Sequence, residues 1–68
     1  MLISARNSFK GTVTKINTGA VNTEVIIEIT PGVEVAAIIT KSSADNLQLV
    51  EGGQAIAIVK ASDVMVAV

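Results

Sequence analysis

Hydrophobic and polar residues alternate along most of this chain, which is the pattern of half-buried β-strands. The clearest case is the stretch from Val21 to Thr30, VNTEVIIEIT, in which every second residue is Val, Thr or Ile. The dipeptide Pro31-Gly32 follows, and it fits a type II turn because proline fixes φ at the first central position and glycine accepts a positive φ at the second. We therefore expect the next run, Val33 to Thr40, to pair back as a hairpin.

Further strands are expected on both sides of this hairpin. A looser alternation from Ser8 to Ile16 predicts a strand, and Gly11 within it indicates a bulge or a bend of the kind that a small barrel needs. A tight turn is expected at Thr18-Gly19. The run from Gln54 to Lys60, QAIAIVK, is apolar at both alternating sets of positions, which is typical of a strand buried on both sides. After a short turn, the run from Val64 to Val68 predicts a last strand.

One segment departs from the alternating pattern. The stretch from Ser42 to Leu47, SSADNL, begins with residues favoured at a helix N-cap, and it predicts one or two helical turns capped by Ser42 or Ser43. The expected order is three strands, a short helix and two more strands. That order matches an all-β fold, a small five-stranded OB-like Greek-key barrel with one short helix, as a single domain over residues 1–68.

The size and composition of the chain favour an oligomer. A chain of 68 residues buries only about 60% of the surface that its unfolded form exposes, so it is marginally stable alone. It contains no cysteine and no histidine, so disulfides and ordinary zinc sites cannot supply the missing stability. Half of the residues are hydrophobic and only 16% are charged. Contact between copies is the remaining way to bury this apolar surface.

Composition also disfavours several classes of function. Without His or Cys, few general bases or nucleophiles remain, so we do not expect an enzyme. The net charge of −1, the five scattered basic residues and the single aromatic residue give no footprint for nucleic acid. No apolar run approaches the roughly 20 residues that span a bilayer, and the N-terminus lacks the pattern of a secretory signal. We therefore expect a cytoplasmic protein with no membrane partner.

Three polar clusters interrupt the apolar strands, each at a strand end. They are Ser4-Ala5-Arg6-Asn7, Thr40-Lys41-Ser42-Ser43 and Lys60-Ala61-Ser62. All are rich in hydrogen-bond donors and contain no carboxylate, and a tetrahedral oxyanion is held by cations, hydroxyls and free backbone N–H groups. A fully deprotonated dianion suits them better than hydrogen phosphate, whose P–OH needs an acceptor. The same residues would also serve as helix caps, turn residues and solvated strand ends in a protein without a ligand.

Sequence motifs at the two ends of the chain indicate a protein family more specifically than the spacing of the polar clusters does. The chain opens with MLISARN and closes with IVKASDVM, and between them it contains VNTEVIIEI and AAIITKSSADNLQLVEGGQ. Together these motifs resemble the Mop or TOBE domains that bind molybdate, over essentially the whole chain. A chain made of one such domain is similar to a molbindin, a free-standing molybdate-binding protein. The resemblance implies a homo-oligomer, a hexamer built as a trimer of dimers, with oxyanions held between subunits.

The resemblance also implies which residues bind the anion. One side of a pocket between subunits would be formed by residues of the first and last motifs: Ser4, Arg6, Lys60 and Ala61, the last through its backbone N–H. The other side would come from the T-x-x-S stretch: Thr40 and Ser43. Further candidates lie beside these residues or at a second kind of site on the threefold axis: Asn7, Ser62, Ala20, Val21 and Asn22.

These expectations describe a binding protein. Its function would be reversible capture of molybdate, and of tungstate with it, for intracellular molybdenum storage or homeostasis, with no cofactor and no metal cation bound directly. Arg6 and Lys60 would balance the −2 charge of the dianion, because burying it without fixed positive charge would cost several kcal/mol. Two alternatives remain open from the residues: a structural oligomeric OB-like module, and a binder of another oxyanion such as sulfate or phosphate.

Overall fold

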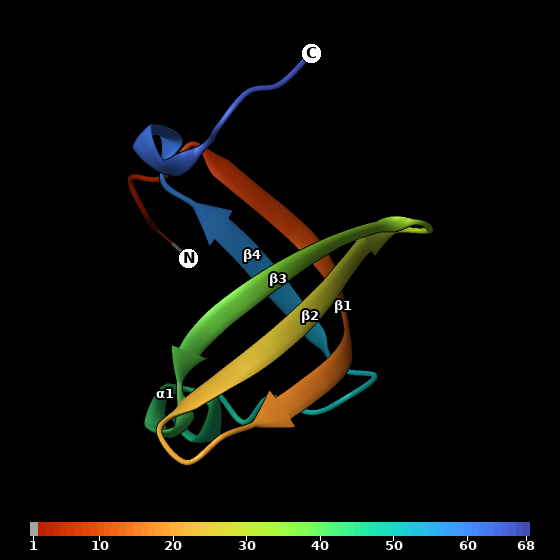
Figure 1. The fold of residues 1–68 in the computed structure, drawn as a ribbon, viewed down its shortest axis with the longest axis vertical. Coiled ribbons are helices and arrows are strands. Elements are labelled where there is room, and N and C mark those ends of the chain that lie inside the picture. Colours follow the sequence, from red (N-terminus) through yellow and green to blue (C-terminus); the bar gives the residue numbers. More distant parts are fainter. Residues whose placement is uncertain (1) are drawn as a thin grey trace.

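Four strands form one antiparallel sheet in a computed structural model that describes residues 2–68. The strands are β1 (Asn7–Thr18), β2 (Asn22–Thr30), β3 (Val33–Thr40) and β4 (Gln54–Val59), and their order across the sheet is β3-β2-β1-β4. A short helix, α1 (Lys41–Asn46), lies between β3 and β4 in the chain, and a 3₁₀ turn, η1 (Ala61–Asp63), follows β4. The sheet curls into a half-barrel that stays open between β3 and β4, its two edge strands (Figure 1).

Strand β1 runs through the middle of this sheet and pairs on both sides. Its first half pairs with β4, from Asn7 opposite Val59 to Thr12 opposite Gln54. Its second half pairs with β2, and the register shifts between Val13 and Lys15. The bulge therefore lies after Gly11 in the chain, and not at Gly11 as the sequence predicted.

Gly11 has a different role, which is to let β1 and β2 approach closely. A Cβ atom at Gly11 would lie 2.5 Å from the carbonyl oxygen of Glu28 and 2.7 Å from Cγ2 of Ile27. Both distances are well inside van der Waals contact, so any larger residue would push the two strands apart.

The core lies on the concave face of the sheet and is small. Its buried hydrophobic side chains are Val13, Val25, Ile27, Ala44 and Ala57. Val25 and Ile27 belong to the alternating run that predicted β2, and that hairpin is confirmed: β2 pairs with β3, and Gly32 between them has a φ of 84°, as a type II turn requires. The turn at Thr18-Gly19 is also confirmed, since the Gly19 N–H donates to the Asn22 carbonyl at 2.8 Å.

Three predicted details of the elements are wrong. Strand β1 begins at Asn7 and ends at Thr18, longer than the predicted stretch, because its ends pair with β4 and β2. Helix α1 begins one residue earlier, at Lys41, and its N-cap is Thr40 rather than a serine. Strand β4 is not buried on both sides, because it lies at a sheet edge: Ile56 is 40% exposed and only its Ala57 is buried.

The predicted last strand is absent. Residues 64–68 follow η1 without joining the sheet, and Met65 and Val66 are 93% and 89% exposed. The physical reason is that a strand needs a neighbour, whereas this segment leads away from the sheet at the end of β4 (Figure 1). Residues 2–68 of a single chain therefore contain four strands rather than five.

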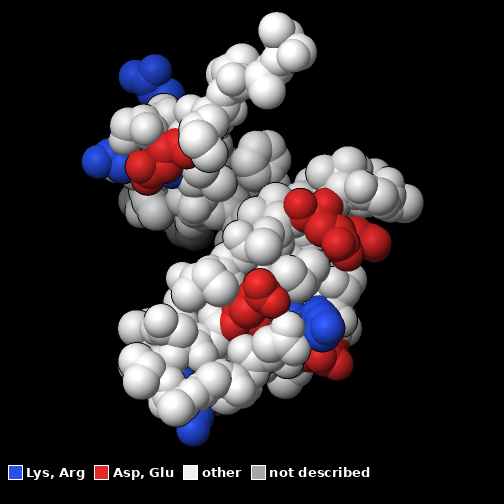
Figure 2. Space-filling view, viewed as in Figure 1, with Lys and Arg blue, Asp and Glu red and all other residues white. Residues whose placement is uncertain are grey.

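Much apolar surface is left uncovered in a single chain. Large hydrophobic side chains that are more than half exposed include Val21, Ile38, Leu47 and Val50. On the face shown in Figure 2, charged side chains form a few separate groups, and uncharged atoms make up most of the surface. This agrees with the argument from composition that the chain needs a partner surface.

The close approach at Gly11 leads to a stability prediction. Replacing Gly11 with Ala should lower the free energy of unfolding by about 1–3 kcal/mol, because the added methyl group overpacks the β1–β2 contact. Urea denaturation of the variant measures this loss. The control is Lys10→Ala on the exposed neighbouring residue, which should change stability by less than about 0.5 kcal/mol. Equal midpoints for the two variants would contradict the proposed role of Gly11.

Candidate functional site

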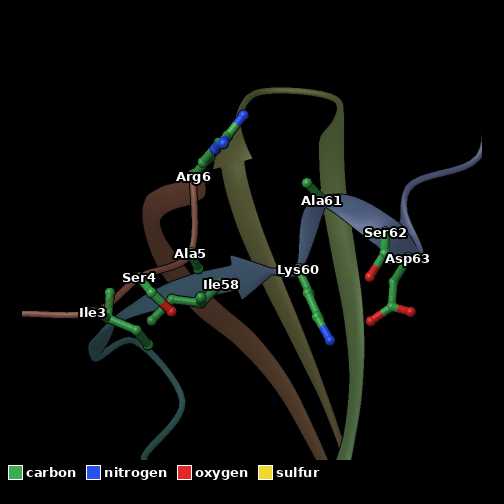
Figure 3. A pocket seen from close by; sticks show the side chains of 9 residues that line it. All are labelled: Ile3, Ser4, Ala5, Arg6, Ile58, Lys60, Ala61, Ser62 and Asp63. Atoms are coloured by element: carbon green, nitrogen blue, oxygen red, sulfur yellow. The ribbon is translucent and has the colours of Figure 1, made fainter.

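The structure brings the first and last polar clusters together in one open depression. Asn7 pairs with Val59, so the residues just before β1 lie beside the residues just after β4. The depression has a volume of about 730 Å³ and is lined by residues 3–6 on one side and by Ile58 and residues 60–63 on the other (Figure 3). Four of the predicted binding residues therefore share one surface: Ser4, Arg6, Lys60 and Ala61.

The two cations of this depression do not converge in a single chain. Arg6 and Lys60 are both exposed, and their side chains point in different directions (Figure 3). The 3₁₀ turn η1 begins directly after Lys60, and no side chain caps it. Because the first N–H groups of a helical turn have no acceptor within it, the backbone at Ala61 and Ser62 offers donors at this place. The depression can therefore attract an anion, but in one chain it is open rather than closed around a ligand.

Sequence reasoning missed Asp63, the third charged residue of the depression beside Arg6 and Lys60. Asp63 belongs to the lining (Figure 3), so the expectation of a surface without a carboxylate is wrong. A signal was present, because Asp63 directly follows Lys60-Ala61-Ser62, and an acidic residue is favourable in the first turn of a helix. The carboxylate gives the depression an acceptor, which weakens the argument that hydrogen phosphate is excluded.

Asn7, a further candidate, has a structural role in the described chain. Its side-chain amide donates to the Val59 carbonyl at 3.2 Å, where β1 and β4 pair. The amide thus helps to hold the two sides of the depression together. Ser62, by contrast, lies in the lining itself.

The second predicted half of the site lies elsewhere, around the start of α1. The Thr40 hydroxyl accepts from the Ser43 backbone N–H at 3.1 Å and donates to the Ser43 hydroxyl at 2.8 Å. This is the N-cap of α1, with Thr40 in an extended conformation before the helix. Both residues are exposed.

The turn Ala20-Val21-Asn22 lies beside this N-cap. Asn22 pairs with Thr40 across β2 and β3, and the Lys41 N–H donates to the Val21 carbonyl at 2.8 Å. The turn follows the end of β1, whereas the depression adjoins its beginning, so the two groups of candidate residues lie at opposite ends of a 12-residue strand. One chain therefore carries both halves of the predicted site without joining them.

Other kinds of site find no support in the part of the chain that the structure describes. Residues 2–68 contain no group of three or more His, Cys, Asp or Glu side chains placed to hold a metal ion. Among the same residues, no helix has the length and hydrophobicity to cross a membrane.

The sequence is similar to a defined family of domains. A model of the TOBE domain matches residues 3–66. Molybdenum-pterin-binding protein 2 of Clostridium pasteurianum is 42% identical over 66 residues, which is 97% of each chain. Molybdenum transport protein ModE of Azotobacter vinelandii is 49% identical over 65 residues, which is 96% of this chain but only 24% of ModE. The chain belongs to the TOBE domain family, as its motifs indicated.

Solved structures show the same fold. MopII from Clostridium pasteurianum in an apo form superposes with a TM-score of 0.92 at 40% identity, covering 98% of this chain and all of MopII. A molybdate-binding protein from Sporomusa ovata gives 0.91 at 37% identity, covering 98% of both chains. The cytoplasmic molybdate-binding protein ModG, with molybdate bound, gives 0.90 at 43% identity, and the match covers 96% of this chain and 46% of ModG.

The N-cap at Thr40 can be tested separately from any binding. Thr40→Val removes the oxygen that accepts the Ser43 N–H, so the free energy of unfolding should fall by about 0.5–2 kcal/mol. Thr40→Ser keeps that oxygen and is the matched control. Thermal denaturation, monitored by circular dichroism, compares the stability of the two variants. A valine variant as stable as the serine variant would show that the cap does not stabilise the fold.

Proposed function

We propose that this protein binds molybdate reversibly in the cytoplasm, for molybdenum storage or homeostasis. The observation that carries the proposal is the depression that Ser4 and Arg6 line from one side and Lys60 and Ala61 from the other, beside the β1–β4 pairing. The relatives support the choice of anion, since a solved relative is named as a molybdate-binding protein and another holds molybdate. The role is binding and not catalysis, because capture of the anion makes and breaks no covalent bond.

The complete site is formed between subunits. Thr40 and Ser43 lie at the far end of the sheet from Arg6 and Lys60, so an anion that contacts both groups must contact two chains. The exposed apolar surface and the small core support such an assembly. A hexamer built as a trimer of dimers, which the motif resemblance implies, is part of the proposal.

The chemistry of the two halves suits a tetrahedral dianion. Arg6 and Lys60 offer two positive charges for the −2 charge of the anion, and the planar guanidinium can form two parallel hydrogen bonds to its oxygens. The backbone N–H at Ala61 and the hydroxyls of Ser4, Thr40 and Ser43 add neutral donors. Tungstate has the same charge and nearly the same size, so the site should accept it as well.

Two groups of residues have secondary roles in this proposal. Ser62 contributes an additional hydroxyl to the main site, whereas the Asn7 amide orients the strand ends. The turn Ala20-Val21-Asn22 forms part of a second oxyanion site on the threefold axis, supported by its place beside the Thr40 cap.

An alternative function has one observation in its favour. The Asp63 carboxylate in the depression can accept a hydrogen bond from a protonated oxyanion, so a binder of hydrogen phosphate is the second candidate. Sulfate, fully deprotonated like molybdate but smaller, is the third anion to compare.

Isothermal titration calorimetry of anion-free protein distinguishes these anions. In a buffer free of sulfate and phosphate, molybdate should give saturable heat with about one anion or slightly more per chain, and sulfate and phosphate should bind much more weakly. Equally tight binding of sulfate or phosphate would support an anion site but contradict its selectivity for molybdate. No heat with molybdate would leave a structural module whose polar clusters only cap turns.

The charge of Arg6 should dominate affinity. Arg6→Ala should weaken molybdate binding by about 2–5 kcal/mol, because it leaves the buried dianion with one cation fewer. The control is Lys10→Ala, which removes an exposed cation of β1 outside the depression and should leave the affinity nearly unchanged. If Arg6→Ala binds as tightly as Lys10→Ala, the assignment of the site is wrong.

A further inference from the structure

The depression that carries the proposed function contains one acidic residue. The structure describes all six acidic residues of the chain, and of these only Asp63 belongs to the lining. Arg6 and Lys60 are the other charged residues there, so two positive charges and one negative charge give the lining a formal charge of +1. An oxyanion of charge −2 is therefore attracted by the two cations and repelled by the carboxylate of Asp63.

The fold fixes the place of Asp63 relative to Lys60. Lys60 is the N-cap of η1, and Asp63 is the third residue after it. The Asp63 N–H donates to the Lys60 carbonyl at 2.9 Å, and the third residue after an N-cap lies close enough for its side chain to reach back to the cap, as in a capping box. In Figure 3 the side chains of Lys60 and Asp63 extend to the same side, whereas that of Arg6 extends to the opposite side. An anion that contacts the Lys60 ammonium group therefore comes near the Asp63 carboxylate.

A role in stability alone does not account for this carboxylate. An acidic residue is favourable in the first turn of a helix because many peptide dipoles are aligned there, but η1 is only three residues long. Asp63 is also exposed, and exposed charges contribute little to stability because water and salt screen them. A charged ligand that displaces water from the depression is screened less, so the carboxylate has a larger effect on the ligand than on the fold.

The effect of the carboxylate depends on whether the anion carries a proton. Molybdate and sulfate carry none near neutral pH, so each of their oxygens that approaches Asp63 adds repulsion between like charges. Hydrogen phosphate has a P–OH group, which donates a hydrogen bond to a carboxylate, and a hydrogen bond from O–H to O⁻ is one of the stronger kinds in proteins. The same residue thus disfavours an anion without a proton and offers a compensating contact to an anion with one.

We propose that Asp63 is a specificity-determining residue of the anion site, which lowers the affinity of the site for fully deprotonated oxyanions relative to oxyanions that carry a proton. The inference rests on the proposed function, since it concerns the same depression. Arg6 and Lys60 attract any anion, and Asp63 makes the strength of binding depend on the protonation state of that anion. The wild-type site therefore binds molybdate less tightly than the two cations alone would allow, which favours release of the anion.

Replacement of the carboxylate by an amide tests this role. Asp63→Asn keeps the size of the side chain and the backbone hydrogen bond to Lys60, and it removes the charge. Molybdate and sulfate should each bind about two- to fivefold more tightly to this variant than to the wild type, because the repulsion is gone. Inorganic phosphate should bind no more tightly, since it also loses the charged acceptor of its P–OH group. Calorimetric titration of anion-free protein at low ionic strength measures all three affinities.

Three further variants separate the position of the charge from its presence. Glu34→Gln removes one carboxylate from an exposed residue of β3 outside the depression and should leave all three affinities nearly unchanged. Asp63→Glu keeps the charge at the depression, so it should not show the tighter binding of molybdate and sulfate. Asp63→Ser is a second neutral variant, with a side chain that is well tolerated at the start of a helical turn, and it should behave as Asp63→Asn does.

The possible results separate this inference from the proposed function. Unchanged affinities in both neutral variants would overturn the inference, and so would equal tightening for all three anions or the same tightening in Glu34→Gln, because these would show only an effect of net charge. If the wild type binds sulfate and phosphate but gives no heat with molybdate, the proposed function fails, and the comparison of sulfate with phosphate still tests Asp63. A wild type that binds none of the three anions would overturn both.

Discussion

The rest of the structure depends on strand β1, because it joins the β2–β3 hairpin to β4. Its first half pairs with β4 and its second half with β2, so it joins the two halves of the sheet. That shared pairing is possible because Gly11 allows the backbones to approach more closely than any side chain would permit. The same strand separates the two polar regions, since the depression adjoins its start and the Thr40 cap lies near its end. The pairing of the strands, and not contacts among the polar side chains, thus determines where the two groups of candidate binding residues lie.

The sequence was most informative where a structural feature depends on near neighbours in the chain. The β2–β3 hairpin follows from alternation and from the conformations that Pro31 and Gly32 allow. The meeting of the first and last clusters was implied by the family motifs, and alternation alone could not show it, because it depends on pairing between Asn7 and Val59, 52 residues apart.

The wrong predictions concern features whose structure depends on which segment or side chain lies beside them in the folded protein. The segment after η1 has the composition of a strand but finds no partner within its own chain, and β4 looks like a central strand but lies at an edge. The cap was assigned to a serine because several residues in TKSS can cap a helix, and only the hydrogen bond from Ser43 to Thr40 distinguishes them. Asp63 was overlooked for a related reason, because its place in the depression depends on where η1 turns the chain.

The turn from Lys60 to Asp63 has a thermodynamic consequence. These residues line the anion depression and lead directly into residues 64–68, which are apolar and exposed in a single chain. Under the proposed function, in which the site lies between subunits, binding and assembly are coupled by linkage. An anion that binds only the assembled protein stabilises the assembly, and the assembly in turn raises the apparent affinity for the anion. Dilution of the protein would then release its ligand even at a constant free anion concentration, so the amount of protein in the cell would itself regulate how much anion is held.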